Sequence, residues 1–184
     1  MKQSLKNSLK RAALVSAMGL APIFAHASPE LVAALQEAGV PLTAEQATTL
    51  ESAQGEQLVN AIAAIAESLG DNGQAIQALI SAAVAQNPEQ ATEIVGAATF
   101  SAPGAAAIIA GAAVRAAPSQ AAAITAAAVS VAPTQGAAIT AAATAAAPAQ
   151  AQSINEASTA SVQAGAEAEA EVPQEPQQPE PSPN

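Results

Sequence analysis

A 15-residue repeat runs through the second half of this 184-residue chain. Each unit opens with a proline and carries an isoleucine six residues later. The prolines are Pro88, Pro103, Pro118, Pro133 and Pro148, and the isoleucines are Ile94, Ile109, Ile124, Ile139 and Ile154. A short, fixed period is typical of proteins in which stacked units contact mainly their neighbours. The repeat therefore predicts a stacked fold, and it leaves open what the stacked surface contacts.

Each unit predicts one short helix. The unit at residues 118–132 is mostly alanine after its proline, and alanine has the highest helix propensity. Proline suits the first turn of a helix, where its missing N–H is not needed. It also disfavours helical geometry in the residue before it, so we expect helices of about 11 residues that end before the next proline. One continuous helix would cost ~3 kcal/mol at each interior proline, which excludes it.

The same unit predicts which face of the helix is buried. At 100° per residue, isoleucine lies at the centre of a broad stripe of small side chains, while Ala122 points away from it. The stripe consists of Gln120, Ala121, Ile124, Ala127, Ala128 and, at its edge, Val131. A helix this short does not persist alone in water, so stability must come from burial between units. The predicted fold class is all-α, with short alanine-rich repeats stacked as a compact solenoid of about eight helices.

The repeat becomes irregular toward both ends, which divides the chain into four segments. These are a signal peptide (1–27), irregular helical units that form an N-terminal cap (28–72), the 15-residue repeats (73–162) and a tail (163–184). In the cap, residues 29–35 and 44–50 look like two helical units, and a turn at residues 70–72 lengthens the unit before Gly73. The tail is rich in Pro, Gln and Glu, so we expect it to be disordered.

The first 27 residues have the pattern of a secretory signal. A basic start precedes an apolar stretch at residues 12–24, and Ala25-His26-Ala27 then forms a cleavage site before Ser28. The alternative is an uncleaved anchor, but the apolar stretch is shorter than the ~20 residues that span a bilayer. We therefore expect a mature chain that begins at Ser28, has no stable membrane insertion, and is periplasmic or extracellular.

The mature chain has an unusual composition. It contains no His, Cys, Lys, Met, Trp or Tyr, and only one arginine, Arg115, and one phenylalanine, Phe100. With one arginine and fifteen acidic residues its formal charge is −14. Nucleic acid is excluded as a partner, because such binding depends on Lys and Arg side chains that neutralise phosphates. Anionic membrane surfaces are excluded for the same reason.

Few types of catalysis are open to such a chain. A serine or threonine nucleophile needs a base such as His or Lys, and zinc, haem and iron–sulfur sites need Cys or His. Carboxylate chemistry remains, but in the repeats it rests on Glu89 and Glu93, which offset the macrodipole at a helix N-terminus. The sequence therefore predicts no enzyme, no cofactor and no metal site.

Four residues are candidates for an interaction surface. Phe100 and Arg115 occupy equivalent places in consecutive units, where later units carry Ser130 and Ala145, so we expect both to be exposed. An aromatic beside an arginine has the composition of a binding hot spot, although unconstrained surface positions give the same composition. Thr125 and Thr140, which are equivalent to each other, complete the set: Phe100, Arg115, Thr125 and Thr140.

A glutamine lies two residues after several of the prolines. The members are Gln90, Gln120, Gln135 and Gln150. A row of amides presented to a polymer or to ice is one interpretation. The favoured one is that each amide donates to a carbonyl left unpaired at the end of an adjoining helix.

The function predicted from the sequence is an exported, non-enzymatic structural or interaction protein. Its partner is an unknown protein or envelope polymer, and end-to-end self-association is a further hypothesis. The alternative is an ice- or surface-binding protein that presents flat alanine and threonine faces. Against it, Ala110 and Val95 occupy the place of Thr125 and Thr140 in other units, so no regular row of threonines exists. A carboxylate-based enzyme is the least favoured alternative.

Overall fold

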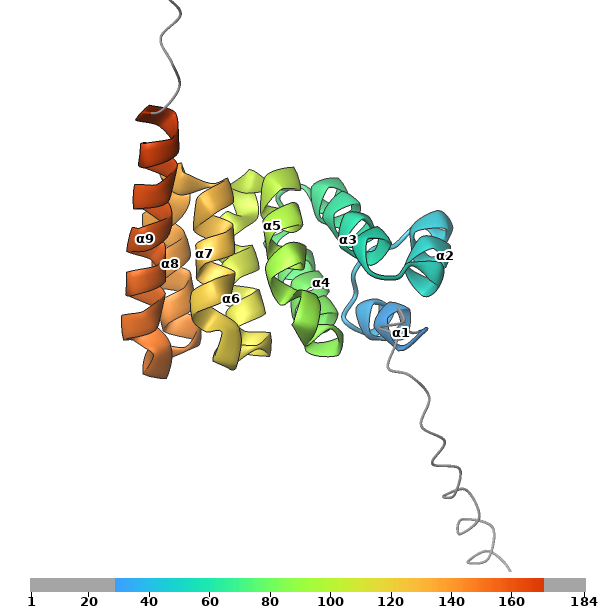
Figure 1. Ribbon diagram of the computed structural model, residues 1–184. Helices are drawn as coiled ribbons and strands as arrows, with labels where there is room; N and C mark the ends of the chain where they lie inside the picture. Colours follow the sequence, from blue (N-terminus) through green and yellow to red (C-terminus); the bar gives the residue numbers. More distant parts are fainter. Residues whose placement is uncertain (1–28, 171–184) are drawn as a thin grey trace, which may run out of the picture.

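The computed structural model describes residues 29–170, which form nine α-helices, five short 3₁₀ turns and no strand (Figure 1). The α-helices are α1 (Pro29–Glu37), α2 (Ala44–Ser52), α3 (Glu56–Leu69), α4 (Gly73–Gln86), α5 (Ala91–Ser101), α6 (Ala106–Ala116), α7 (Ala121–Val131), α8 (Gly136–Ala146) and α9 (Ala151–Ala170). The 3₁₀ turns are η1 (Pro88–Gln90), η2 (Pro103–Ala105), η3 (Pro118–Gln120), η4 (Pro133–Gln135) and η5 (Pro148–Gln150). The predicted signal peptide and residues 171–184 of the predicted tail lie outside the described residues.

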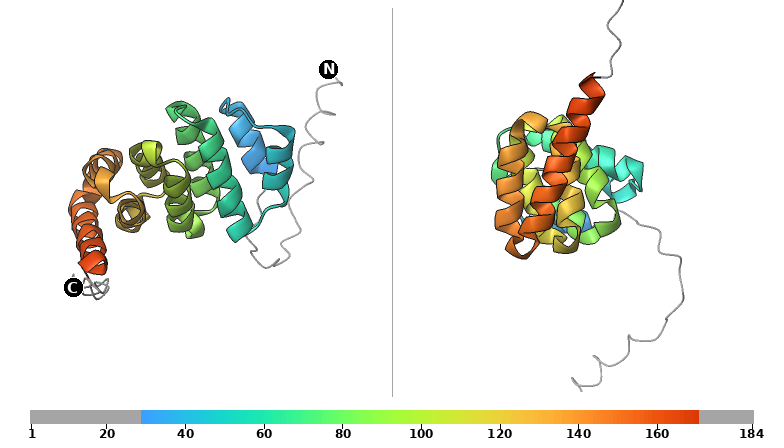
Figure 2. Two further views of the ribbon diagram at one scale, coloured as in Figure 1. Left: turned by 90° about the horizontal axis from the view of Figure 1, so that it is seen from above. Right: turned by 60° about the vertical axis from the view of Figure 1, so that its left-hand side comes forward.

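The helices form two rows. The most extensive packing joins every second helix, so α3, α5, α7 and α9 form one row and α4, α6 and α8 form the other. Consecutive helices run in opposite directions (Figure 1), and the stack extends from α1 at one end to α9 at the other (Figure 2). The predicted all-α solenoid of 15-residue units is confirmed. The largest contacts, however, skip one unit, because each helix turns back beside the one before it.

Each proline opens a separate 3₁₀ turn, whereas the sequence placed it in the first turn of the α-helix. In one unit, η3 spans Pro118–Gln120 and α7 follows directly. A single residue, Ala117, with φ −132° and ψ 71°, separates η3 from the helix before it. The N–H of Ala117 donates to the Ala113 carbonyl (2.8 Å), and its own carbonyl accepts from the N–H of Gln120 (3.0 Å). One residue outside helical geometry is therefore enough to reverse the chain, which leaves 11 residues for the α-helix.

The buried face differs in part from the predicted stripe. Helices α5 and α7 bury the same five positions, which in α7 are Ala121, Ile124, Thr125, Ala128 and Val129. In contrast, Ala127 is only half-buried and Val131 is 38% exposed. The reason is that α7 is covered from two directions, by α5 and α9 in its own row and by α6 and α8 in the other. The buried arc therefore turns toward Thr125 and Val129.

Two of the four glutamines that follow the prolines, Gln120 and Gln135, link units of the same row. The Gln120 side-chain amide donates to the Pro88 carbonyl (2.8 Å), and Gln135 bonds to the Pro103 carbonyl in the same way. The sequence predicted that each amide donates to an unpaired carbonyl at the end of an adjoining helix, and for Gln120 and Gln135 only the backbone carbonyl as partner is confirmed. The carbonyl lies at the start of that unit, however, and already accepts the N–H of Ala91. Gln120 and Gln135 are thus used inside the stack and are not free for a polymer or ice.

The two ends of the stack differ from the interior. At the N-terminal end, α1 and α2 match the two predicted units, and Thr43 and Gln46 form a capping box at the start of α2. At the other end, α9 continues to Ala170, past residue 163 where the sequence predicted the tail to begin (Figure 2). Alanine and glutamate alternate there and both favour helix, and the next proline is Pro173. No helix of the described part is both long and apolar enough to cross a membrane.

Candidate binding cleft at a break in the repeat

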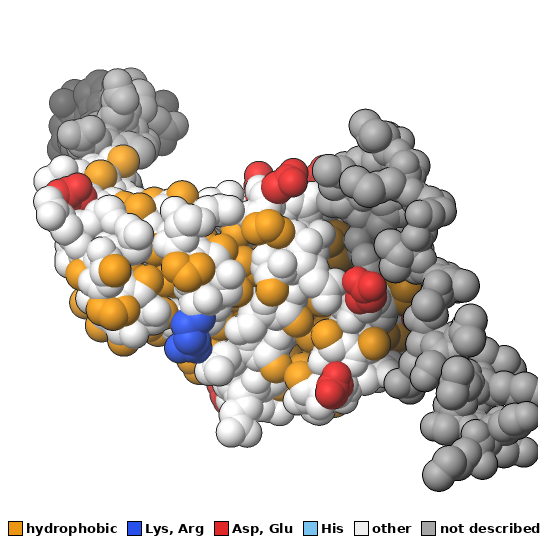
Figure 3. All heavy atoms as spheres, turned by 90° about the horizontal axis from the view of Figure 1, so that it is seen from below, with side chains coloured by type: hydrophobic (Ala, Val, Ile, Leu, Met, Phe, Trp, Pro, Cys, Tyr) orange, Lys and Arg blue, Asp and Glu red, His pale blue; other side chains and the backbone are white. Residues whose placement is uncertain are grey.

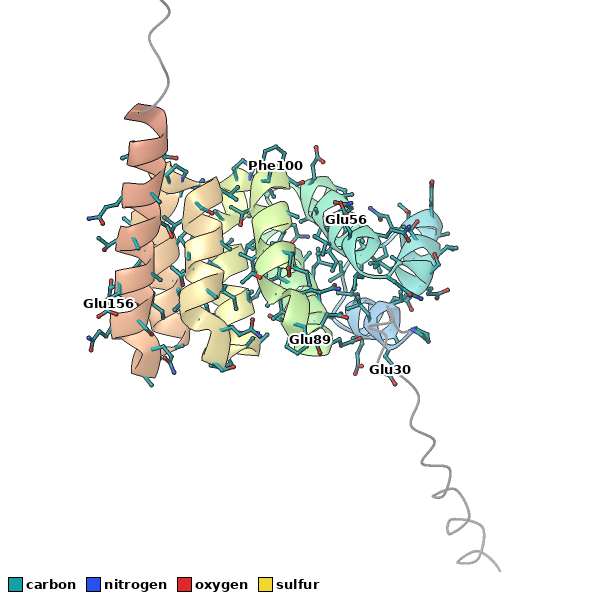
Figure 4. All side chains as sticks on the ribbon, in the orientation of Figure 1. Glu30, Glu56, Glu89, Phe100 and Glu156 are labelled. Atoms are coloured by element: carbon teal, nitrogen blue, oxygen red, sulfur yellow. The ribbon has the colours of Figure 1, made fainter. Side chains whose placement is uncertain are left out.

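The structure separates Phe100 from Arg115. Both are exposed, as predicted, and Phe100 is 78% exposed at the end of α5 (Figure 4). Because α5 and α6 run in opposite directions, Phe100 lies at the edge where α5 ends, and Arg115 lies at the opposite edge, where α6 ends. Figure 3 shows that opposite edge, where the Lys/Arg colour appears in a single place. The hypothesis of an aromatic beside an arginine is therefore wrong, because equivalent places in consecutive units face opposite edges.

The two threonines are engaged within the stack. Thr125 is fully buried and its hydroxyl donates to the Ala121 carbonyl (2.7 Å), so it is not part of any surface. The hydroxyl of Thr140 bonds to the Gly136 carbonyl and to the hydroxyl of Ser158, both at 2.7 Å. Thr125 was assigned to the interaction surface because its helix was expected to have only one covered face. The second row of helices covers it.

A wide groove of about 930 Å³ lies between α8 and α9, at the C-terminal end of the stack. Its polar lining includes Thr140, Thr144, Asn155 and Thr159. The positions of Thr140 and Thr144 are buried in α5, α6 and α7, because later helices cover them. In α8 they are only half-buried, because no later helix follows α8 in its own row. Polar residues at the last uncovered positions of a repeat stack are typical of a cap, which explains this groove without a ligand.

A smaller cleft of about 230 Å³ lies between the turn that joins α3 to α4 and the turn that joins α5 to α6. We call it the α3–α6 cleft. Its lining consists of Glu67, Gly70, Asp71, Gly73, Ile76, Ser101, Ala102, Gly104, Ala105 and Ile108. The carboxylate-bearing side chains of Glu67 and Asp71 are exposed, whereas Ile76 is fully buried and closes the inside. Phe100 directly precedes Ser101, so the cleft and the exposed aromatic ring share one edge of the stack.

The cleft lies where the chain departs from its repeat. Residues 70–72 are an insertion, and Gly73 stands where later units have proline. A Cβ at Gly73 would lie only 2.8 Å from Cδ1 of Ile108, which occupies a place that is alanine in the next two units. Ala105 stands at the place of Gln120 and Gln135, whose side chains bond to the unit two repeats earlier. These departures from the repeat therefore coincide at one cleft.

Two of the glycines in the cleft are not required by the backbone. Among the described glycines, positive φ occurs at Gly39, Gly55 and Gly70, and so not at Gly73 or Gly104. A Cβ at Gly104 would meet nothing within 4 Å. The equivalent turns carry Ser119 and Thr134 at this place, so the turn itself accepts a side chain. Gly104 therefore leaves this part of the cleft lining without a side chain.

We predict that Gly104→Thr leaves the protein folded and its stability unchanged or raised by up to about 1 kcal/mol. A side chain there lowers the entropy of the unfolded chain and meets open space in the folded one. Thermal unfolding followed by circular dichroism measures the change. A fall in stability of more than about 1 kcal/mol would show that this glycine serves the fold and not the cleft.

The side chains that line the cleft are of few chemical types. Its lining contains no His, Lys or Cys, so Ser101 has no base beside it except carboxylates. Within residues 29–170, no three His, Cys, Asp or Glu side chains lie together in a group that could hold a metal ion. What the lining offers is apolar surface, two carboxylates and a hydroxyl.

No family model matches the chain, and no curated protein or solved structure matches it either. The insertion and Gly73 were visible in the sequence, where they were interpreted as decay of the repeat toward its cap. An alignment of the units would also have shown Gly104, Ala105 and Ile108 as departures. That the five features meet in one cleft depends on the two-row packing, which brings every second turn to the same edge.

Proposed function

We propose that this chain is an exported, non-enzymatic interaction protein that binds a partner protein at the α3–α6 cleft. The observation that carries the proposal is the gathering of departures from the repeat around one cleft, next to the exposed ring of Phe100. Side chains that stacking does not use are the ones a repeat protein can devote to binding. An exposed aromatic beside a cleft is a frequent centre of binding energy.

The proposed location is the periplasm or the extracellular space. Its support is the secretory signal pattern of residues 1–27, with a cleavage site before Ser28. The absence of His, Cys and Lys after that site supports a binding role over a catalytic one.

We do not carry the ice-binding alternative further. A flat ice-binding face needs exposed, regularly spaced hydroxyls, but Thr125 is buried and Thr140 is bonded to Ser158. The groove between α8 and α9 is lined by alanine and valine as well as by threonine and asparagine, so end-to-end self-association stays a hypothesis.

The proposal is tested by photo-crosslinking in the cells that export this chain. We expect p-benzoylphenylalanine at position 100 to give a protein adduct of defined mass, because it keeps an aromatic ring beside the cleft. The matched control places the probe at Ala145, which is exposed at the equivalent position of α8 on the opposite edge. The second control adds Gly104→Thr, which should reduce the adduct at position 100. Equal adducts at positions 100 and 145, or none at position 100, would contradict the proposal.

A further inference from the structure

We propose that the α3–α6 cleft receives a lysine or arginine side chain of a basic partner protein. This inference rests on the proposed function and names the chemistry by which the cleft recognises its partner.

The size of the cleft fits one side chain. Its volume of about 230 Å³ is below the roughly 300–1,000 Å³ of pockets that enclose drug-sized ligands. The cleft opens at an edge formed by two turns, so a neighbouring protein surface can insert a side chain from outside. The cleft therefore suits one long side chain of a partner, while the partner's backbone stays outside.

The lining matches both parts of such a side chain. Ile108, which is 39% exposed, offers apolar surface to the aliphatic stem of lysine or arginine, and the buried Ile76 and Ala105 lie behind it. Glu67 and Asp71 provide carboxylate oxygens that accept hydrogen bonds from an ammonium or guanidinium group. The exposed ring of Phe100 lies on the same edge and can attract a cation through its face.

Within residues 29–170, no cationic side chain lies beside the cleft. Arg115 is the only Lys or Arg among residues 29–170, and it lies at the opposite edge of the stack. The negative charge of Glu67 and Asp71 is therefore not neutralised by any side chain of residues 29–170, and a cation from a partner can neutralise it. A chain of formal charge −14 after signal removal also attracts a basic partner over a distance, most strongly at low salt.

The test uses the full mature chain and a short peptide, acetyl-Gly-Gly-Arg-Gly-Gly-amide, followed by heteronuclear NMR. The matched control peptide carries citrulline, which has nearly the shape of arginine but no charge. We expect the arginine peptide to shift the amide signals of Gly70, Gly73 and Gly104 saturably, with a Kd of about 1 mM, because one exposed side chain makes few contacts. High salt should weaken binding. Equal shifts from the citrulline peptide, or no shifts from the arginine peptide, would overturn the inference.

Variants localise the effect. We expect Glu67→Gln with Asp71→Asn to weaken binding about fivefold, since two exposed charge contacts are lost. Gly104→Thr, which adds a side chain to the cleft lining, should reduce the affinity further. The control pair is Glu89→Gln with Glu93→Gln, which should leave the affinity unchanged. Glu89 lies at the opposite edge (Figure 4), and Glu93 is in the first turn of α5, at the end of that helix away from Phe100. If the control pair weakens binding as much as the cleft pair, the peptide responds to overall charge and the inference is wrong.

The photo-crosslinking test and the peptide-binding test distinguish failure of the proposed function from failure of the cationic ligand. An adduct at position 100 together with no arginine binding would leave the interaction protein standing and refute the cationic ligand. Arginine binding together with no adduct at position 100 would show that the cleft recognises a cation, and would refute the partner complex in the exporting cells.

Discussion

Ile124→Asp is expected to unfold several units of the stack. Ile124 is fully buried at the centre of α7, between two rows of helices, so an aspartate there loses a branched side chain and buries an unpaired carboxylate. The combined cost of about 4–5 kcal/mol is comparable with the whole stability of a small domain, about 5–15 kcal/mol. Circular dichroism should show lost helix at room temperature or a Tm lower by about 10–20 °C.

The matched control is Ala123→Asp. The sequence placed Ala122 on the outer face, but the structure shows it half-buried, whereas Ala123 is exposed. A carboxylate at Ala123 stays in water near a helix N-terminus, so its effect should be within about 0.5 kcal/mol. Equal losses from Ile124→Asp and Ala123→Asp would mean that the buried face has been assigned wrongly.

Deletion of one whole repeat is expected to be milder than deletion of half of one. Removing residues 118–132 joins Ala117 to Pro133, and Gln135 then takes the place of Gln120 opposite the Pro88 carbonyl. Because α8 buries Gly136, Ile139 and Ala143 at the places of Ala121, Ile124 and Ala128 in α7, α8 can replace α7 between its neighbours. The shortened protein should unfold cooperatively with a Tm lower by only a few degrees, about 2–8 °C.

Removing only residues 118–125 should do more damage. It takes Ile124 and joins the rest of α7 to α6 without a turn, so Ile139 and the glutamine of the next unit lose their register. We expect a Tm lower by more than about 10 °C, or no cooperative transition, because contacts to both rows are lost. A half-unit deletion that unfolds no earlier than the whole-unit deletion would show that the alanine-rich region is not a stacked solenoid.

The sequence by itself determined the unit of this fold. Proline at a 15-residue spacing excludes a continuous helix, alanine makes each interval helical, and the isoleucine that follows each proline supplies the side chain that must be buried. All three are local properties, set by a residue's own backbone and by the helical period. The exposure of Phe100 was predicted for a related reason, since a place that accepts Phe, Arg, Ser and Ala is not one that packing constrains.

Only the tertiary structure decided how the units meet. A helix of this composition has the same period whether one or two sides of it are covered, so the period predicts neither the burial of Thr125 nor the exposure of Val131. It also placed Phe100 beside Arg115, because equivalent positions look adjacent along a repeat. In the stack, alternate helices reverse direction and send them to opposite edges. The α3–α6 cleft has the same origin: its two carboxylates and Ile108 are far apart in the chain, and the row that joins α4 to α6 brings them together.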